Sequence, residues 1–160
     1  MSSEEPDLKK IRNRALRLLS RRSYSQFQLE QKLLQHHCQK EVGALVEKLI
    51  ETRFLDDARL AEERALMLRR RRHWGPQRIK GDLRRLGFDA KIVARVTDLA
   101  DSEFPPEETL ARVIDSWTEK NGAPDSVAGL KRLFDHCRRQ GFPSQMVRDV
   151  LEPFSGGRGA

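Results

Sequence analysis

Apolar residues return at intervals of three and four along nearly the whole chain, and no stretch alternates convincingly with a period of two. Intervals of three and four place apolar side chains on one face of a helix, whereas strands need a period of two. The pattern therefore predicts an all-α protein. We expect nine helices, of which the first covers about residues 8–21, the second follows a cap at Ser23 or Ser25, and the third covers about residues 40–53.

Turn residues delimit the other six helices. Asp56 and Asp57 are expected to open a long fourth helix, since carboxylates suit the positive end of the helix dipole. Gly75 and Pro76 separate it from the fifth, because glycine commonly ends a helix and proline suits the first turn of the next. The fifth helix closes at Gly87, and the others are expected over about residues 90–99, over about 107–121, from 127 to a stop at Gly141, and from 144 onward.

The spacing also predicts the side chains that line the core. The inward-facing positions are Ile11, Ala15, Leu18, Leu19, Phe27, Leu29, Leu33, Leu34, Val42, Leu45, Val46, Leu49, Ile50, Ile79, Leu83, Leu86, Ile92, Val93, Val96, Leu99, Leu110, Val113, Ile114, Trp117, Val127, Leu130, Phe134, Cys137, Met146, Val147, Val150 and Leu151.

Self-comparison indicates internal repeats. The clearest match pairs two segments 54 residues apart, Gly87-Phe88-x3-Ile92-Val93-x2-Val96 and Gly141-Phe142-x3-Met146-Val147-x2-Val150. It predicts three tandem three-helix repeats at 8–55, 56–104 and 105–154, between a flexible N-terminus at 1–7 and a disordered tail at 155–160. Units this small should stack into an elongated, curved array. A compact nine-helix bundle is the alternative, and the array is favoured because the match includes turn chemistry.

Composition narrows the class of protein. The chain has 160 residues, a net charge of +7 and a pI near 9.8, so polyanions and acidic proteins are the first partners to consider. Its longest apolar run is only Ala65 to Leu68, which predicts neither a transmembrane helix nor a signal peptide. Two cysteines provide no disulfide framework, and a reducing cytoplasm is the simplest interpretation.

The positive charge is concentrated in the middle of the chain. Between Arg64 and Arg85 the only acid is Asp82, and the window carries +8. This excess predicts binding of an anionic partner, either the DNA backbone or an acidic protein surface, whereas a solvated face is the alternative. Four consecutive arginines cannot share one helix face, so at least one of them must point toward a neighbour or ligand. The nine basic residues are Arg64, Arg69, Arg70, Arg71, Arg72, Arg78, Lys80, Arg84 and Arg85.

Trp74 lies beside this window. It could stack on a base or anchor in a pocket of a partner, but next to Gly75 and Pro76 we expect it to pack over a helix junction. Asp56 and Asp57 could form a catalytic carboxylate pair, yet helix capping explains them better because no nucleophile or metal partner is nearby in the sequence.

No motif predicts a metal site or a catalytic site. The candidate metal ligands are His36, His37, Cys38, His136 and Cys137, and none has the paired spacing of a zinc site. Cys137 falls in the apolar series of its helix and is expected in the core. A phosphate-binding glycine loop, an HExxH motif and a nucleophile elbow are all missing from the sequence, which predicts a protein that is not an enzyme and holds no cofactor.

Ordered blocks of the sequence resemble the RecX family, over about Ile11 to Phe154. This chain has Leu60 where the family usually has Phe or Tyr, and its junction at residues 36–40 has no match. The blocks are Leu16-x2-Leu19-x2-Arg22-x2-Ser25-x3-Leu29-x3-Leu33, Phe54-Leu55-Asp56-Asp57-x2-Leu60-Ala61, Gly75-Pro76-x-Arg78-Ile79-x3-Leu83-x3-Gly87-Phe88, and Arg132-Leu133-Phe134 with Arg139-x-Gly141-Phe142.

The resemblance implies a cytoplasmic bacterial regulator, made of three such repeats, that binds the filament of the RecA recombinase on DNA. Such proteins lodge in the groove of the filament and damp its ATP hydrolysis, strand exchange and co-protease activity, either by dismantling the filament or by blocking its extension. It also implies a structural role for the motif residues Asp56, Asp57, Gly75, Pro76, Ile79, Leu83, Gly87, Gly141 and Phe142. We expect a monomer, and a DNA-binding protein that acts without the recombinase is the alternative.

Overall fold

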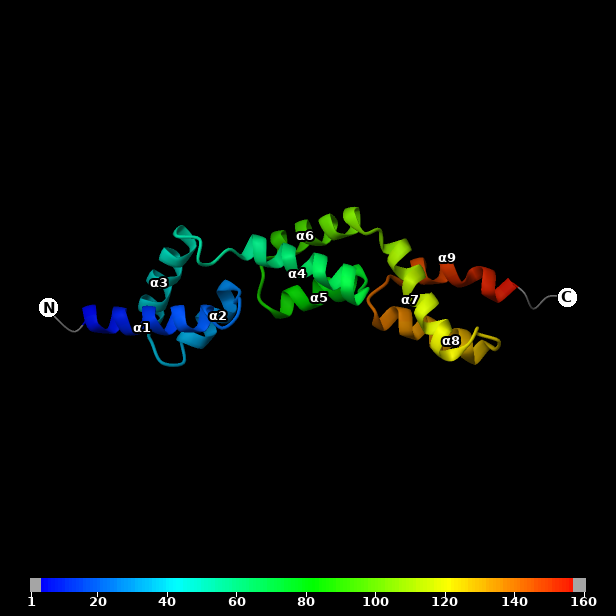
Figure 1. The fold of residues 1–160 in the computed structure, drawn as a ribbon, viewed down its shortest axis with the longest axis horizontal. Coiled ribbons are helices and arrows are strands. Elements are labelled where there is room, and N and C mark those ends of the chain that lie inside the picture. Colours follow the sequence, from blue (N-terminus) through cyan, green and yellow to red (C-terminus); the bar gives the residue numbers. More distant parts are fainter. Residues whose placement is uncertain (1–3, 157–160) are drawn as a thin grey trace. The chain divides into compact units, whose positions relative to one another are not determined.

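The computed structural model describes residues 4–156, with side chains from Asp7 onward. These residues form nine α-helices and no strand, which confirms the predicted all-α class (Figure 1). The helices are α1 (Glu4–Leu19), α2 (Gln26–Leu33), α3 (Gln39–Glu51), α4 (Asp57–Arg72), α5 (Pro76–Arg85), α6 (Ala90–Glu103), α7 (Pro106–Asn121), α8 (Val127–Arg139) and α9 (Ser144–Ser155).

The helix ends differ from the prediction at both termini. α1 begins at Glu4, so the backbone of residues 4–7 is helical rather than flexible. α9 continues to Ser155, whose hydroxyl donates to the carbonyl of Glu152. Residues 1–3 and 157–160, for which we predicted looseness and disorder, lie outside the described residues.

The described chain packs as two compact units. Unit 1 comprises residues 4–61 and 83–93, and unit 2 comprises residues 62–82 and 94–156. The segment predicted as the middle repeat contributes to both units. The three-repeat boundaries and the elongated, curved array therefore stay predictions.

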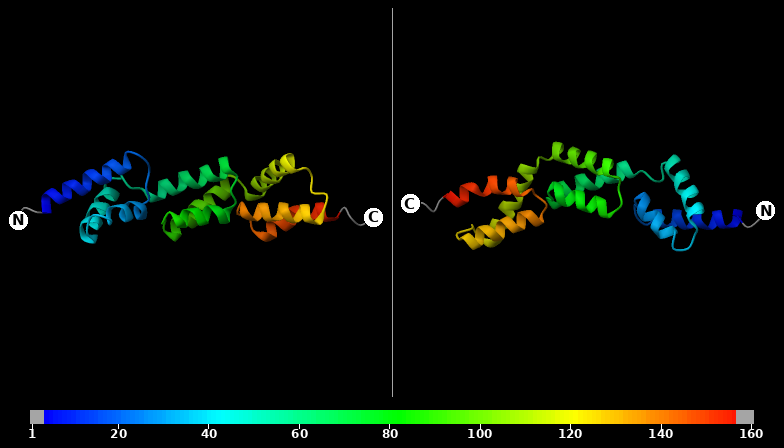
Figure 2. Two further views of the ribbon diagram at one scale, coloured as in Figure 1. Left: turned by 90° about the horizontal axis from the view of Figure 1, so that it is seen from below. Right: turned by 180° about the vertical axis from the view of Figure 1, so that it is seen from behind.

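Unit 1 has a core between α1, α2 and α3, which form one group in both views of Figure 2. Phe27 and Ile50, both predicted to face inward, are instead 46% and 42% exposed. Each lies off the buried stripe of its helix, because Phe27 is two positions from buried Leu29 and Ile50 is one position after buried Leu49. The buried members of this core are Ile11, Ala15, Tyr24, Leu29, Leu33, Val42, Leu45, Val46, Leu49 and Leu55.

Ser25 is the N-cap of α2, which selects it from the two predicted alternatives, Ser23 and Ser25. Its hydroxyl accepts from the backbone N–H of Gln28 at 3.2 Å, and the Gln28 side chain accepts from the backbone N–H of Ser25 at 3.2 Å. The same hydroxyl donates to the carbonyl of Leu86 at 2.5 Å, and the residue is fully buried. Ser25 therefore both starts α2 and ties it to a distant segment of unit 1.

We expect Ser25→Ala to lower the free energy of unfolding by about 2 kcal/mol, since it removes a helix cap and leaves the carbonyl of half-buried Leu86 without its donor. Urea unfolding followed by circular dichroism would measure the change. Ser20→Ala is a suitable control, because the Ser20 hydroxyl is exposed and donates only to the carbonyl of Arg17 three residues earlier. Equal effects of the two substitutions would contradict the role assigned to Ser25.

Unit 2 has its core between α7, α8 and α9. Cys137 is fully buried there, as predicted, whereas Val127 is 74% exposed and that prediction was wrong. Val127 lies outside the core because Ser126 caps α8 and Val127 is only the first residue of the helix. The buried members are Leu110, Val113, Ile114, Leu133, Cys137, Phe142, Val147 and Leu151.

Candidate basic interaction site

The last turn of α4 carries the arginine run Arg69–Arg72. The helix ends where predicted, but His73 rather than a glycine adopts the left-handed conformation, with φ of 54°. Its N–H donates to the carbonyl of Arg69, and the N–H of Trp74 donates to that of Leu68. These bonds satisfy carbonyls at the end of the helix, which is the usual role of a left-handed residue there.

Arg69 is not available to a partner. The sequence grouped it with the partner-binding residues, but its side chain is 0% exposed. Its guanidinium donates to the carboxylate of Asp101 at 2.5 Å and to the carbonyl of Phe104 at 2.9 Å. Arg69 is thus the arginine of the run that had to point inward, and it holds the end of α6 against α4.

Arg70, Arg71 and Arg72 are exposed, and none forms an ion pair with another described residue. Their position at the negative end of the α4 dipole offsets part of their mutual repulsion. Three guanidinium groups remain free to bind carboxylates or phosphates.

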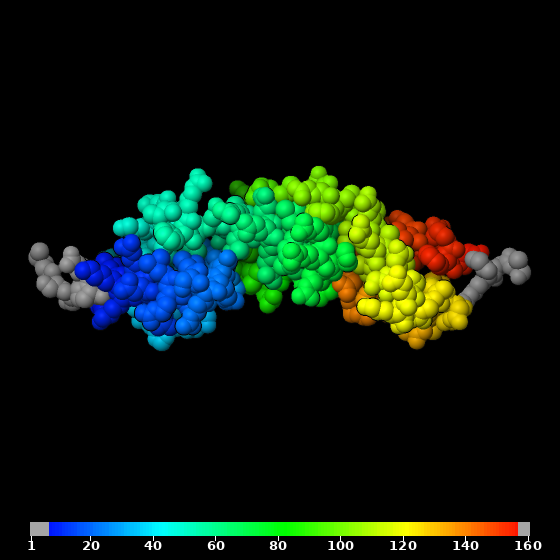
Figure 3. Space-filling view, viewed as in Figure 1, coloured from blue at the N-terminus to red at the C-terminus, as the bar shows by residue number. Residues whose placement is uncertain are grey.

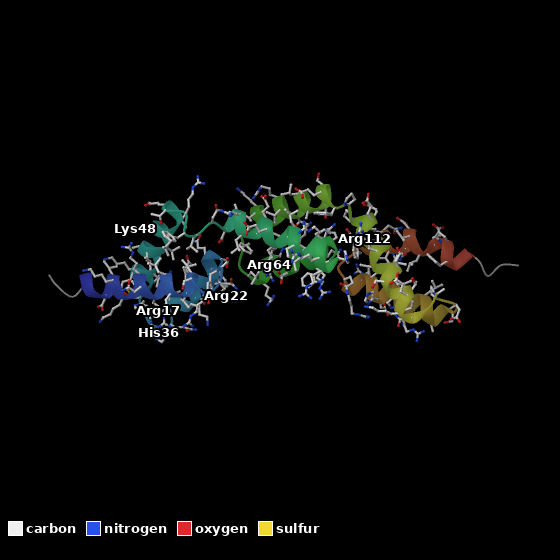
Figure 4. The ribbon with its side chains drawn as sticks, viewed as in Figure 1. Arg17, Arg22, His36, Lys48, Arg64 and Arg112 are labelled. Atoms are coloured by element: carbon white, nitrogen blue, oxygen red, sulfur yellow. The ribbon has the colours of Figure 1, made fainter. Side chains whose placement is uncertain are left out.

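Arg112 of α7 joins this group, although no sequence pattern selects it. Arg70 and Arg112 line one pocket of unit 2, with Glu108 as its only acidic member. Arg112 is exposed and is labelled in Figure 4. It lies in the last third of the chain, whose eight basic and eight acidic residues balance, so composition could not single it out. We call Arg70, Arg71, Arg72 and Arg112 the arginine patch.

Arg64 belongs to a structural ion pair. Its guanidinium binds the carboxylate of Asp82 through two hydrogen bonds of 2.5 and 3.2 Å, and the Asp82 side chain is only 6% exposed. The single acid of the basic window is therefore matched to Arg64. Lys80 is half-buried, while Arg84 and Arg85 are exposed and belong to unit 1.

Arg78 and Trp74 contact each other at the start of α5. The Arg78 guanidinium lies 3.9 Å from the Trp74 ring centre and donates to the side-chain oxygen of Gln140 at 2.9 Å. Trp74 is half-buried, with one ring face occupied by this cation. The arrangement fits the predicted packing over a helix junction, and a base could stack on that face only by displacing Arg78.

The two glycine motifs meet at this junction within unit 2. The backbone N–H of Gly75 donates to the carbonyl of Gln140 at 2.7 Å, and the N–H of Gln77 donates to that of Gly141 at 3.0 Å. Carbonyls after the end of α8 thereby satisfy N–H groups at the start of α5, and the two helix dipoles meet with opposite charges. Gly75 has no room for a Cβ, which would collide with the backbone of Gly141.

The two aspartates at the start of α4 have different roles. Asp56 accepts from the N–H of Arg59 at 3.0 Å, and Asp57 accepts from the N–H of Gln26 at 2.9 Å. Burial raises the pKa of Asp57, and the charges of Asp56 and Glu30 raise it further against the lowering effect of the Gln26 bond. The capping interpretation is confirmed for Asp56, while Asp57 ties α2 to the start of α4.

The histidines and cysteines do not gather around a metal position. Residues 7–156 contain no group of three His, Cys, Asp or Glu side chains that could hold an ion. Burial raises the pKa of the Cys137 thiol to about 11, so it stays protonated at neutral pH. Burial also lowers the pKa of His136, and the charges of Arg139, Lys120 and Arg78 lower it further. Among the described helices, none is long and apolar enough to cross a membrane.

The helices of the described residues define a small all-α protein. A family model described as "RecX, first three-helix domain" matches residues 12–49, and one described as "RecX, second three-helix domain" matches residues 56–96. The chain belongs to the RecX family, which is a family of regulatory proteins.

Individual relatives agree with this assignment. Regulatory protein RecX of Halorhodospira halophila is 31% identical over 141 residues, covering 86% of this chain and 84% of that protein. Regulatory protein RecX of Stenotrophomonas maltophilia is 30% identical over 136 residues, covering 84% and 81%. The crystal structure of RecX from Lactobacillus salivarius has a TM-score of 0.82 at 18% identity, covers 94% of this chain and 97% of its own, and shows the shared fold.

Proposed function

We propose that this protein binds the filament of the RecA recombinase on DNA and inhibits its recombinase, ATPase and co-protease activities, thereby modulating DNA repair and recombination. Membership of the RecX family is the observation that carries the proposal. In this proposal the protein acts in the bacterial cytoplasm as a monomer and catalyses no reaction.

The arginine patch supports a docking role in this function. Its guanidinium groups are exposed, and no carboxylate of the described residues forms an ion pair with them. Exposed arginines can make two parallel hydrogen bonds to a carboxylate or to a phosphate. We therefore assign the patch to contact with the filament, through acidic side chains of the recombinase or through the DNA backbone.

The second candidate function is sequence-independent DNA binding without the recombinase. The same exposed guanidinium groups favour it, since they suit phosphates as well as carboxylates. Binding to duplex or single-stranded DNA in a gel shift, with no effect on the recombinase, would select this candidate.

Mixing the protein with purified RecA, single-stranded DNA and ATP tests the primary proposal. We expect ATP turnover to fall as the protein is added. Unchanged turnover at several-fold molar excess would overturn the proposal.

A triple variant in which Glu replaces Arg70, Arg71 and Arg72 should need a concentration about tenfold higher, or more, for half-maximal ATPase inhibition. A tenfold shift corresponds to about 1.4 kcal/mol, close to the energy of one charge-assisted hydrogen bond. Arg78 is left intact because it contacts Trp74 and Gln140. The ATPase assay measures the shift, and circular dichroism verifies the fold.

A matched control reverses three other exposed cations of unit 2, Lys120, Lys131 and Arg132. It makes the same change in net charge on α7 and α8 and leaves α4 intact. Equal loss of inhibition in both variants would show that only net charge matters, and normal inhibition by the α4 variant would remove the patch from the docking surface.

A further inference from the structure

Helix α1 carries a second concentration of positive charge. Between Leu8 and Arg22 the sequence has seven basic residues and no acid. The charge balance over residues 1–55, 11 basic against 7 acidic, hides this segment because all seven acids lie outside it. The seven residues are Lys9, Lys10, Arg12, Arg14, Arg17, Arg21 and Arg22.

Four of these residues follow one side of the helix. Lys10, Arg14 and Arg17 are spaced by four and three positions, which places them one above the other on one flank of α1. Arg21 continues the spacing in the turn that follows the helix, where Arg22 also lies (Figure 4). At a rise of about 1.5 Å per residue, Lys10 and Arg17 are about 10 Å apart along the axis. We call Lys10, Arg14, Arg17 and Arg21 the α1 basic row.

The fold gains nothing from this row. Like charges one helical turn apart destabilise a helix by roughly 0.2–0.5 kcal/mol per pair. Arg14, Arg17 and Arg21 make no side-chain ion pair with a described residue, and the buried Nε of Arg14 has no hydrogen-bond partner among them. Lys10 pairs only with exposed Asp7 at 3.5 Å, an interaction too weak to compete with a stronger anion.

The packing of α1 leaves little apolar surface for insertion into a membrane. A helix that lies on a membrane inserts its apolar face into the lipid. The apolar face of α1 is already used, because Ile11 and Ala15 are fully buried and Leu18 packs against the same core. The exposed side of α1 is mainly charged, and Figure 3, where blue marks the N-terminal part of the sequence, shows this helix at the surface.

The chemistry of the row favours the backbone of double-stranded DNA. Sites for single-stranded nucleic acids use aromatic side chains on which bases stack, and hot spots of protein interfaces are enriched in Trp and Tyr as well as Arg. The row has no aromatic side chain, and nearby Tyr24 is 8% exposed with the Arg22 guanidinium 4.2 Å from its ring centre. Duplex DNA needs only cations, since it presents one negative charge per about 1.7 Å of its axis.

We propose that the α1 basic row binds the phosphodiester backbone of double-stranded DNA without reading its sequence. Each arginine can donate two hydrogen bonds to one phosphate, and the spacing of one helical turn lets successive side chains reach successive phosphates. The inference rests on the second candidate function, sequence-independent DNA binding without the recombinase, and deepens it by naming a surface other than the arginine patch and the double-stranded form of the DNA.

Fluorescence anisotropy with a labelled duplex of mixed sequence, at salt concentrations between about 50 and 200 mM, tests the proposal. The test variant replaces Lys10, Arg17 and Arg21 with Gln and leaves half-buried Arg14 intact. We expect the slope of log K against log salt to become shallower by about 2 to 3, close to 0.9 for each phosphate that the variant no longer binds. The matched control replaces Lys32, Lys40 and Lys48, three exposed cations of α2 and α3, and should keep the wild-type slope.

Several results would overturn the proposal. The first two are equal salt slopes for the α1 variant and the control variant, and no duplex binding by the wild-type protein at about 50 mM salt. The third is an α1 variant that loses binding to single-stranded DNA but keeps binding to the duplex. The fourth is binding of the row to polyglutamate as tight as its binding to duplex DNA. Circular dichroism of both variants separates a binding defect from unfolding. Wild-type protein that shows the expected slopes but leaves RecA ATP turnover unchanged would overturn the proposed function while supporting this inference.

Discussion

Gly141→Ala is expected to lower the free energy of unfolding by about 3 to 5 kcal/mol. Backbone strain contributes about 1–3 kcal/mol of this loss, and each hydrogen bond that is broken contributes roughly 1 kcal/mol. The strain arises because Gly141 has φ of +98°, which a residue with a Cβ rarely adopts. The new Cβ would also collide with the backbone nitrogen and the Cβ of Arg78.

The collision cannot be relieved locally. The backbone nitrogen of Arg78 sits in the first turn of α5, next to Gln77, whose N–H donates to Gly141. Moving the two segments apart would lengthen that bond and the bond from Gly75 to Gln140. It would also pull Arg78 away from Gln140. The substitution therefore separates the start of α5 from the end of α8.

Urea unfolding measures this effect, and Gly81→Ala is the matched control. Gly81 lies inside α5, and a Cβ there would have no neighbour within 4 Å. The control is expected to stabilise the protein by about 0.5–1 kcal/mol, because alanine favours a helix over glycine. The same substitution should thus have opposite signs at two positions of unit 2. A stable Gly141→Ala protein would show that the junction is not needed by the fold.

The sequence predicted the local conformation at the glycines but not their contacts. A helix stop was expected at Gly87 and at Gly141, and both adopt positive φ, 81° and 98°. Those conformations are local, and a glycine after an apolar helix is their ordinary signal. The contact between Gly75 and Gly141 joins segments far apart in the chain, and only tertiary packing determines such a pairing.

The arginine run shows the same limit for the candidate site. Helix geometry required one of the four arginines to point inward, and the buried stripe of Ala61, Ala65 and Leu68 could have identified it, because Arg69 follows Ala65 by four residues. The partners Asp101 and Phe104 carried no such signal. Arg112 was missed for a similar reason, since a single arginine in a neutral segment becomes notable only beside Arg70.

Arg69→Met is expected to lower the free energy of unfolding by about 3 kcal/mol, near the lower end of the range for breaking a buried ion pair. The Asp101 side chain is 32% exposed and regains water, which limits the loss, whereas the carbonyl of Phe104 loses a donor. Met keeps much of the volume of the arginine stem, so the effect reports mainly on the charge and its hydrogen bonds. Urea unfolding provides the measurement.

The double variant Arg69→Met with Asp101→Asn isolates the ion pair. Once Arg69 is absent, replacing Asp101 should cost little more, so the two changes should be strongly non-additive. Additive losses would mean that the pair contributes nothing of its own. The neighbouring Arg70→Met should change stability by no more than about 0.5 kcal/mol, as expected for an exposed residue without an ion pair.

Two consecutive residues should therefore have different effects: Arg69 should affect stability, and Arg70 should affect inhibition. Under the proposed function, Arg70→Met should weaken inhibition of RecA ATP turnover while leaving the fold intact, because it removes an exposed guanidinium. Arg69→Met should reduce stability, yet inhibit normally at a temperature where it remains folded, because its side chain cannot reach a partner. Weak inhibition by a fully folded Arg69→Met protein would mean that the ion pair between Arg69 and Asp101 positions the arginine patch. The ion pair would then be needed for docking as well as for stability.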